Sequence, residues 1–283
     1  LRGENDFRVP SMRREKKEGR KRMKGMRKGI YILPNLFTTG SLFCGFFVLL
    51  RTLQEDFHSA AIFILASALL DGMDGRIARY TNTTTRFGLE YDSLADVIAF
   101  CVAPGILVFA WALEPFGRLG WLAAFLFVVC GALRLARFNV QVTTVESRYF
   151  SGLPTPAAAC LLATAILVFY KMGDTGVSKH ITILITTYVL AFLMVSTVKY
   201  YGFKDIELFR RQPFRWLVIA ILLIIVVAYE PEYTLFGLSL IYVISGPILA
   251  FVLMRRRRAP KPLLPEEKAC LLYTSPSPRD RTR

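Results

Sequence analysis

Histidine is almost missing from this chain of 283 residues, which contains only His58 and His180. A zinc, copper or iron site built on imidazole ligands is therefore not expected. The five cysteines form no CxxC pair, and four of them lie in apolar stretches, where a free cysteine behaves as a small buried hydrophobe. Neither a disulfide framework nor a redox pair is predicted.

Charge is also scarce, and negative charge most of all. Charged residues make up 20% of the chain, hydrophobic residues make up 54%, and the mean hydropathy is +0.42. An ordinary soluble domain is about 45–50% apolar. The net charge of +15 is, by itself, typical of proteins that bind nucleic acid or anionic lipid. The apolar stretches decide between the two, because they indicate an integral membrane protein.

Long apolar stretches recur along the chain. A helix needs about 20 mostly apolar residues to cross a bilayer. We therefore predict an all-α, polytopic membrane helix bundle of about eight transmembrane helices. The eight stretches are approximately residues 30–52, 58–80, 89–113, 118–136, 153–171, 180–199, 215–230 and 233–254.

The basic residues predict the orientation of these helices, because Lys and Arg favour cytoplasmic loops. Residues 1–28 hold 12 Lys and Arg, the even-numbered connections are basic, and the last stretch ends in Arg255–Arg258. Both termini are thus expected in the cytoplasm, in a cell (inner) membrane. No aromatic residues alternate with the basic residues 11–28 as base-stacking platforms would. Lipid headgroups, and not nucleic acid, are the expected partner of this segment.

Four aspartates lie close together in the sequence, where two apolar stretches meet. Asp71 and Asp74 are near the end of the second stretch, and Asp92 and Asp96 are near the start of the third. Spacings of three and four residues place each pair on one helix face. The two helices are consecutive and antiparallel, so these faces can meet. A charge at the bilayer centre costs roughly 2.5–3.5 kcal/mol, so the cluster calls for a functional reason.

A divalent metal site gives that reason. Four adjacent carboxylates repel one another unless cations intervene, and Arg79 supplies a single positive charge. Oxygen ligands without His or Cys select Mg²⁺ or Mn²⁺. Two such ions about 3.5–4 Å apart would clamp phosphoryl groups. Gly75 and Gly88 would leave room for a nucleotide diphosphate. The alternative, helix-end acids solvated by the cytoplasm, explains one aspartate better than four.

The segment from Asp71 to Asp96 resembles the signature of the CDP-alcohol phosphatidyltransferases, DxxDGxxARx₈GxxxDxxxD, at every defined position. The resemblance implies that a CDP-linked lipid binds with its diphosphate on the metals, an alcohol attacks the lipid-side phosphorus, and CMP leaves. It also implies roles for individual residues. Asp71, Asp74, Asp92 and Asp96 would bind metal, Asp96 would also be the general base, and Gly75, Ala78, Arg79 and Gly88 would surround the CDP group.

The flanking segments are similar to the membrane-integral phosphatidylserine synthases of that family. This similarity implies CDP-diacylglycerol as donor, L-serine as acceptor and a homodimer. Glycerol 3-phosphate or inositol as acceptor, and an ether-lipid donor, remain alternatives. The segments are PNLFTTGSLFCGF (34–46), FCVAPGILVF (100–109), CGALRLARFN (130–139), GLPTPAAA (152–159) and MVSTVKY (194–200).

Two further groups of polar residues lie near the same cytoplasmic end. Asn35 and Thr38 are one turn apart on the first stretch, at a depth suited to the nucleotide or diphosphate. Arg134, Arg137 and Asn139 close the fourth stretch and suit a serine carboxylate or a lipid phosphate. Interhelical hydrogen bonding and positive-inside anchoring are the simpler explanations of the two groups.

Two other functions fit the acidic cluster less well. A membrane prenyltransferase would need acidic motifs far apart in sequence, whereas 18 positions separate Asp74 from Asp92. A cation transporter would place its carboxylates near the bilayer midplane, often on broken helices. Neither function accounts for Gly75 and Arg79.

The predicted organisation has four parts. Residues 1–29 form a basic juxtamembrane arm, 30–202 the six-helix catalytic bundle, and 203–257 two additional transmembrane helices. Residues 258–283 form a basic tail. Its end, LLYTSPSPRDRTR, has the character of a translated sequencing adaptor, so we expect a sequence artefact there and assign it no function.

Overall fold

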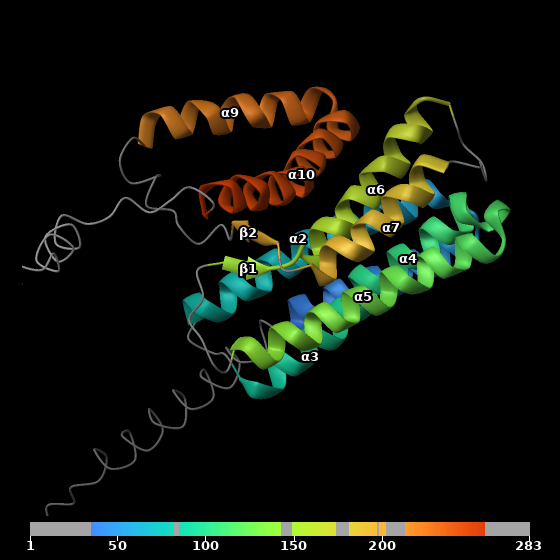
Figure 1. The fold of residues 1–283 in the computed structure, drawn as a ribbon, viewed down its shortest axis with the longest axis horizontal. Coiled ribbons are helices and arrows are strands. Elements are labelled where there is room, and N and C mark those ends of the chain that lie inside the picture. The colour runs from blue at the N-terminus through green and yellow to red at the C-terminus, as the bar shows by residue number, and fades with distance from the viewer. Residues whose placement is uncertain are drawn as a thin grey trace, which may run out of the picture.

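The computed structural model describes residues 35–81, 85–142, 149–173, 181–196, 198–201 and 213–257. These residues form a bundle of long apolar helices and one short β-ribbon (Figure 1). The helical architecture predicted from the sequence is thus confirmed. The predicted basic arm of residues 1–29 and the tail of residues 258–283 lie outside the described residues.

Helical residues overlap each of the eight predicted apolar stretches. Among the described residues, four helices are long and apolar enough to cross a membrane: Asn35–Leu53, Arg86–Phe116, Arg118–Val140 and Pro231–Ala250. The elements are the helix Asn35–Leu53, α2 (Phe57–Thr81), α3 (Arg86–Asp96), α4 (Ala103–Val108), α5 (Arg118–Val142), β1 (Tyr149–Ser151), α6 (Thr155–Lys171), α7 (Ile181–Val195), β2 (Lys199–Tyr201), α9 (Pro213–Tyr229) and α10 (Pro231–Arg257).

The continuous helix Arg86–Phe116 changes its hydrogen-bond pattern directly after Asp96. A π-helical turn, Val97–Val102, joins α3 to α4, and the backbone N–H of Ala103 bonds the carbonyl of Ile98, five residues back. Pro104 explains the wider turn, since proline has no N–H to donate and its ring crowds the carbonyl one turn earlier. This helix therefore leaves regular α geometry beside the predicted site, as π turns often do at functional sites.

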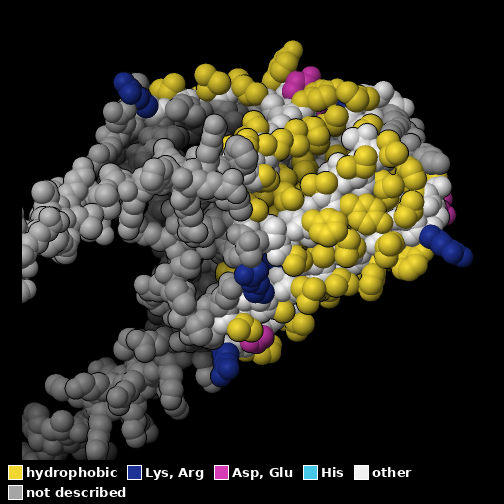
Figure 2. All heavy atoms as spheres, in the orientation of Figure 1, with side chains coloured by type: hydrophobic (Ala, Val, Ile, Leu, Met, Phe, Trp, Pro, Cys, Tyr) yellow, Lys and Arg dark blue, Asp and Glu magenta, His cyan; other side chains and the backbone are white. Residues whose placement is uncertain are grey.

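The core and the outer surface are both apolar. Phe100, Leu107 and Trp111 are fully buried, whereas Leu53 is 80% exposed and Phe125 is 59% exposed. Figure 2 shows apolar side chains spread over the visible face of the described helices. A soluble monomer rarely exposes so continuous an apolar surface. This surface agrees with an integral membrane protein, whose outer side chains contact lipid.

A β-ribbon that the sequence analysis did not predict connects the start of α6 with the end of α7. Strands β1 and β2 are antiparallel, with Phe150 opposite Tyr200. The backbone N–H of Gly152 donates to the carbonyl of Val198 at 2.8 Å. Gly152 has a φ of +86°, and a Cβ there would lie 2.4 Å from the carbonyl oxygen of Met194. The predicted helix 180–199 ends at Val195, and Lys199–Tyr201 pair with β1 instead of continuing the helix.

Candidate active site

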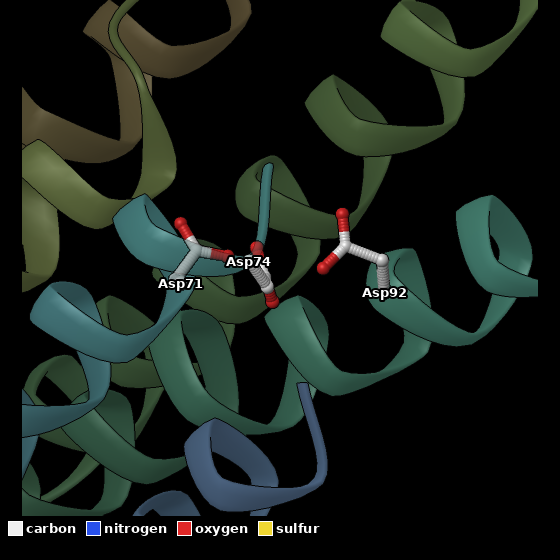
Figure 3. Close-up of side chains that lie close together, drawn as sticks. All are labelled: Asp71, Asp74 and Asp92. Carbon is white, nitrogen blue, oxygen red and sulfur yellow. The ribbon is translucent and has the colours of Figure 1, made fainter. Parts of the chain in front are cut away.

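Three aspartate carboxylates from two helices converge on one point. Asp71 and Asp74 come from the C-terminal half of α2, and Asp92 comes from α3 (Figure 3). One carboxylate oxygen from each lies within 4.8 Å of the other two. The three- and four-residue spacings in the sequence thus place the side chains on facing helix surfaces, as predicted.

Asp96 joins this cluster from the next turn of α3. Its carboxyl group interacts with that of Asp71 and, electrostatically, with those of Asp92 and Asp74. The structure therefore brings together all four predicted aspartates. Asp96 lies on the Asp71 side of the cluster, and the π turn begins one residue after it.

The N-terminal helix Asn35–Leu53 closes one side of the cluster. The hydroxyl of the buried Thr38 donates a hydrogen bond of 2.9 Å to Asp74 Oδ2. A Cβ added to Gly88 would lie 3.2 Å from Asn35 Oδ1, so the absence of a side chain at Gly88 makes room for Asn35. Asn35 and Gly88, which are both predicted to contact CDP, thus lie against each other.

The other predicted CDP contacts lie on α2. Gly75 directly follows Asp74 and is exposed. The backbone of α2 continues through Ala78 and Arg79, but their side chains lie outside the described residues.

The chemistry of the cluster fits a divalent cation. Asp92 Oδ1 is buried and has no hydrogen-bond partner within the described part of the chain. Among the described side chains, no Lys or Arg forms an ion pair with Asp71, Asp74 or Asp92. Adjacent carboxylates without a compensating charge are unfavourable, and a hard cation with oxygen ligands would relieve both their repulsion and the unsatisfied oxygen.

The polar residues at the end of α5 connect the helices around the cluster. Arg134 donates from Nη1 to the Thr155 hydroxyl at 3.2 Å and interacts electrostatically with Asp96. Asn139 donates from Nδ2 to the Ser93 hydroxyl at 2.9 Å, and Ser93 directly follows Asp92. Arg137 is exposed. Of the two predicted arginines, Arg134 is therefore the one that interacts with a carboxylate of the cluster.

Sequence reasoning missed two residues in these contacts. Ser93 and Thr155 each accept a hydrogen bond from a predicted site residue. Ser93 could have been found from its place beside Asp92, and Thr155 from its segment, GLPTPAAA.

The fold and the site define the class of protein. It is a helical integral membrane protein whose acidic cluster can hold a metal ion. A family model described as CDP-alcohol phosphatidyltransferase matches residues 31–198. The chain belongs to this family, which confirms the resemblance seen in the signature. Membership also argues against the prenyltransferase and transporter alternatives.

Curated relatives show which enzymes of the family the chain is similar to. The chain is 40% identical over 213 residues to a CDP-diacylglycerol–serine O-phosphatidyltransferase of Helicobacter pylori, covering 75% of this chain and 90% of the relative. It is 33% identical over 184 residues to the enzyme of that name from Bacillus subtilis, covering 65% and 98%. It is also 35% identical over 170 residues to an archaetidylserine synthase of Methanothermobacter thermautotrophicus, covering 59% and 69%.

Proposed function

We propose that this protein transfers the phosphatidyl group of CDP-diacylglycerol to the hydroxyl of L-serine, forming phosphatidylserine and releasing CMP. The observation that carries the proposal is the convergence of Asp71, Asp74 and Asp92, with Asp96 interacting with Asp71. The serine phosphatidyltransferases among the relatives support the donor and the acceptor.

The cluster would hold two divalent ions, Mg²⁺ or Mn²⁺, through Asp71, Asp74 and Asp92, with Asp96 shared. Bound there, the ions would neutralise the diphosphate and stabilise negative charge that develops during transfer. Thr38 supports this role, because its hydrogen bond fixes the carboxylate plane of Asp74. Hydrogen bonds to ligating carboxylates typically orient them for the metal.

The remaining residues act on the two substrates. Asn35, Thr38, Gly75, Ala78, Arg79 and Gly88 would surround the CDP group, and Arg134, Arg137 and Asn139 would hold the serine carboxylate or the lipid phosphate. Asp96 would take the proton of the serine hydroxyl. The serine oxygen then bonds to the lipid-side phosphorus, the bond from that phosphorus to the bridging oxygen breaks, and CMP leaves with the electron pair.

The membrane arrangement is part of the same proposal. The eight apolar stretches predict eight spans, and the distribution of Lys and Arg predicts cytoplasmic termini and a cytoplasm-facing site in the cell (inner) membrane. We further propose a catalytic bundle of residues 30–202, followed by two added helices in 203–257; the family match at 31–198 supports the first part. The homodimer stays a prediction from the family resemblance.

A CMP-release assay tests the proposed function. Purified protein in detergent would receive CDP-diacylglycerol and Mn²⁺ or Mg²⁺, with L-serine, glycerol 3-phosphate or myo-inositol in separate reactions. We expect release that depends on both serine and metal, and none from Asp92→Asn. Release with another alcohol alone would overturn serine as acceptor. An ether-linked CDP-lipid is the second donor to assay, because one relative is an archaetidylserine synthase.

A further inference from the structure

Three consecutive residues of α3 face three different helices. Asp92 lies with the carboxylates of α2, whereas Tyr91 contacts the N-terminal helix and Ser93 accepts a hydrogen bond from α5. Helix geometry explains this arrangement, because successive side chains are turned by about 100° around the helix axis. Tyr91, directly before a predicted metal ligand, therefore joins α3 to the N-terminal helix.

The hydroxyl of Tyr91 begins a short chain of hydrogen bonds. It lies 3.0 Å from Thr39 Oγ1, and the Thr39 hydroxyl donates at 2.7 Å to the backbone carbonyl of Asn35. Because Thr39 uses its single hydroxyl hydrogen in this second bond, Tyr91 is the donor in the first. The chain of bonds thus ties α3 to the first turn of the N-terminal helix.

The aromatic ring of Tyr91 is held as well as its hydroxyl. The ring of Phe87, one turn earlier on α3, stacks on it with a centroid distance of 6.0 Å and an interplanar angle of 7°. The start of α3 is capped by Thr85, whose hydroxyl accepts a hydrogen bond of 3.0 Å from the backbone N–H of Gly88. The Tyr91 hydroxyl therefore has a defined position beside Thr39.

Residues of α3 hold Asn35 on two sides. Its carbonyl is linked to Tyr91 through Thr39, and its Oδ1 lies 3.2 Å from the place that a Cβ on Gly88 would take. The Asn35 side-chain amide forms no hydrogen bond with another described residue. An amide carries both donor and acceptor atoms, which suits it to a nucleotide.

We propose that Tyr91 is a positioning residue for the donor nucleotide: through Thr39, it holds the first turn of the N-terminal helix so that the Asn35 amide meets the CDP group. This inference rests on the proposed function and deepens its donor site. The neighbouring Thr38 bonds Asp74, so adjacent residues tie this turn to α2 and to α3. Loss of the Tyr91 hydroxyl should therefore weaken nucleotide binding and leave the acceptor site unchanged.

The test measures equilibrium binding of labelled CDP-diacylglycerol, and separately of CMP, to the purified protein in detergent with Mn²⁺ and no acceptor. Tyr91→Phe removes the hydroxyl and keeps the ring that stacks on Phe87. We expect both dissociation constants to rise about fivefold, equivalent to about 1 kcal/mol, the usual net contribution of one hydrogen bond. Thr39→Val, which breaks the same chain of bonds, should match it. The KM for serine in CMP release should stay unchanged in both variants.

Tyr188→Phe is the matched control, because the Tyr188 hydroxyl donates to the Leu119 carbonyl at 3.1 Å and joins α7 to α5 instead. This variant should bind both ligands as wild type does. Weaker binding of CDP-diacylglycerol with unchanged binding of CMP would show that Tyr91 serves the lipid chains, which would overturn the proposal. Unchanged binding of both ligands would overturn it too.

A double mutant tests whether Tyr91 acts through Asn35. In an Asn35→Ala background, Tyr91→Phe should have no further effect on CMP binding, whereas independent contributions would multiply. Independent effects would contradict the positioning role. Because the binding experiments contain no acceptor, CMP release with another alcohol but not with serine would overturn the proposed function alone. Wild-type protein that binds neither CDP-diacylglycerol nor CMP would overturn both.

Discussion

The Thr38 hydroxyl donates a hydrogen bond to Asp74 Oδ2 across the interface between the N-terminal helix and α2, at 2.9 Å. Both residues are buried, with relative exposures of 4% and 5%. A residue predicted to touch nucleotide thus orients a predicted metal ligand. The bond also explains why the first helix, which carries no acid in its described part, belongs to the site.

Thr38→Val should weaken metal binding while preserving the side-chain shape. Loss of a hydrogen bond that supports a metal ligand typically costs about 10–100-fold in metal affinity or activity. The measurement is the Mn²⁺ concentration for half-maximal CMP release. Thr52→Val is the matched control, because the buried Thr52 hydroxyl bonds only the Val48 carbonyl of its own helix among the contacts described. Equal metal requirements in both variants would count against the role of Thr38.

Gly88→Ala should impair binding of CDP-diacylglycerol. The added Cβ would lie 3.1 Å from Thr85 Oγ1 and 3.2 Å from Asn35 Oδ1, so Asn35 must move. We expect a KM for CDP-diacylglycerol raised about tenfold, the effect of about 1.4 kcal/mol. Gly237→Ala on α10 is the control, since a Cβ there meets nothing within 4 Å. An unaltered KM in Gly88→Ala would show that the position of Asn35 does not matter to the donor.

Gly131→Ala should destabilise the contact between α5 and the π turn that follows Asp96. A Cβ at Gly131 would lie 2.5 Å from Cys101 Sγ. Overpacking of this kind typically costs about 1–3 kcal/mol. Thermal unfolding in detergent should show a lower midpoint for Gly131→Ala, with recovery in the Gly131→Ala/Cys101→Ala double variant because the clashing sulfur is gone. A double variant as unstable as the single one would place the strain elsewhere.

Asp96→Asn should abolish turnover while leaving binding of CDP-diacylglycerol largely intact. The substitution keeps the size of the side chain and its capacity to hydrogen-bond Asp71, but an amide cannot accept the serine proton. CMP release and binding of labelled CDP-diacylglycerol would be measured on the same preparation. Near-normal turnover would show that another group is the general base.

The carboxylate cluster could be predicted from sequence, because local spacing alone fixes it. The distances between Asp71 and Asp74, and between Asp92 and Asp96, are set by helix periodicity, and the short connection brings α2 and α3 together. The sequence also placed Thr38 and Asn35 near this end of the bundle, where Thr38 bonds Asp74 and Asn35 lies against Gly88; their contact with nucleotide stays a prediction.

The contacts between distant segments could not be predicted in this way. Strands β1 and β2 are three residues each, too short for an alternating pattern, and their pairing joins segments about fifty positions apart. Arg134 and Arg137 look alike in sequence, and only the packing of α5 against α6 distinguishes the arginine bonded to Thr155 from the exposed one. Tyr200 of β2 bonds the carbonyl of Val243 in α10, forty-three positions later, and no local pattern encodes that contact.

Attack of the serine hydroxyl on the lipid-side phosphorus is the central claim, and an isotope experiment tests it most directly. Purified protein, Mn²⁺ and CDP-diacylglycerol would react with L-serine that carries a heavy oxygen isotope in its side-chain hydroxyl, and mass spectrometry would locate the label. The account predicts the heavy oxygen in the phosphodiester of phosphatidylserine and none in CMP. Label in a CMP-linked product, or a lipid product without label, would contradict it.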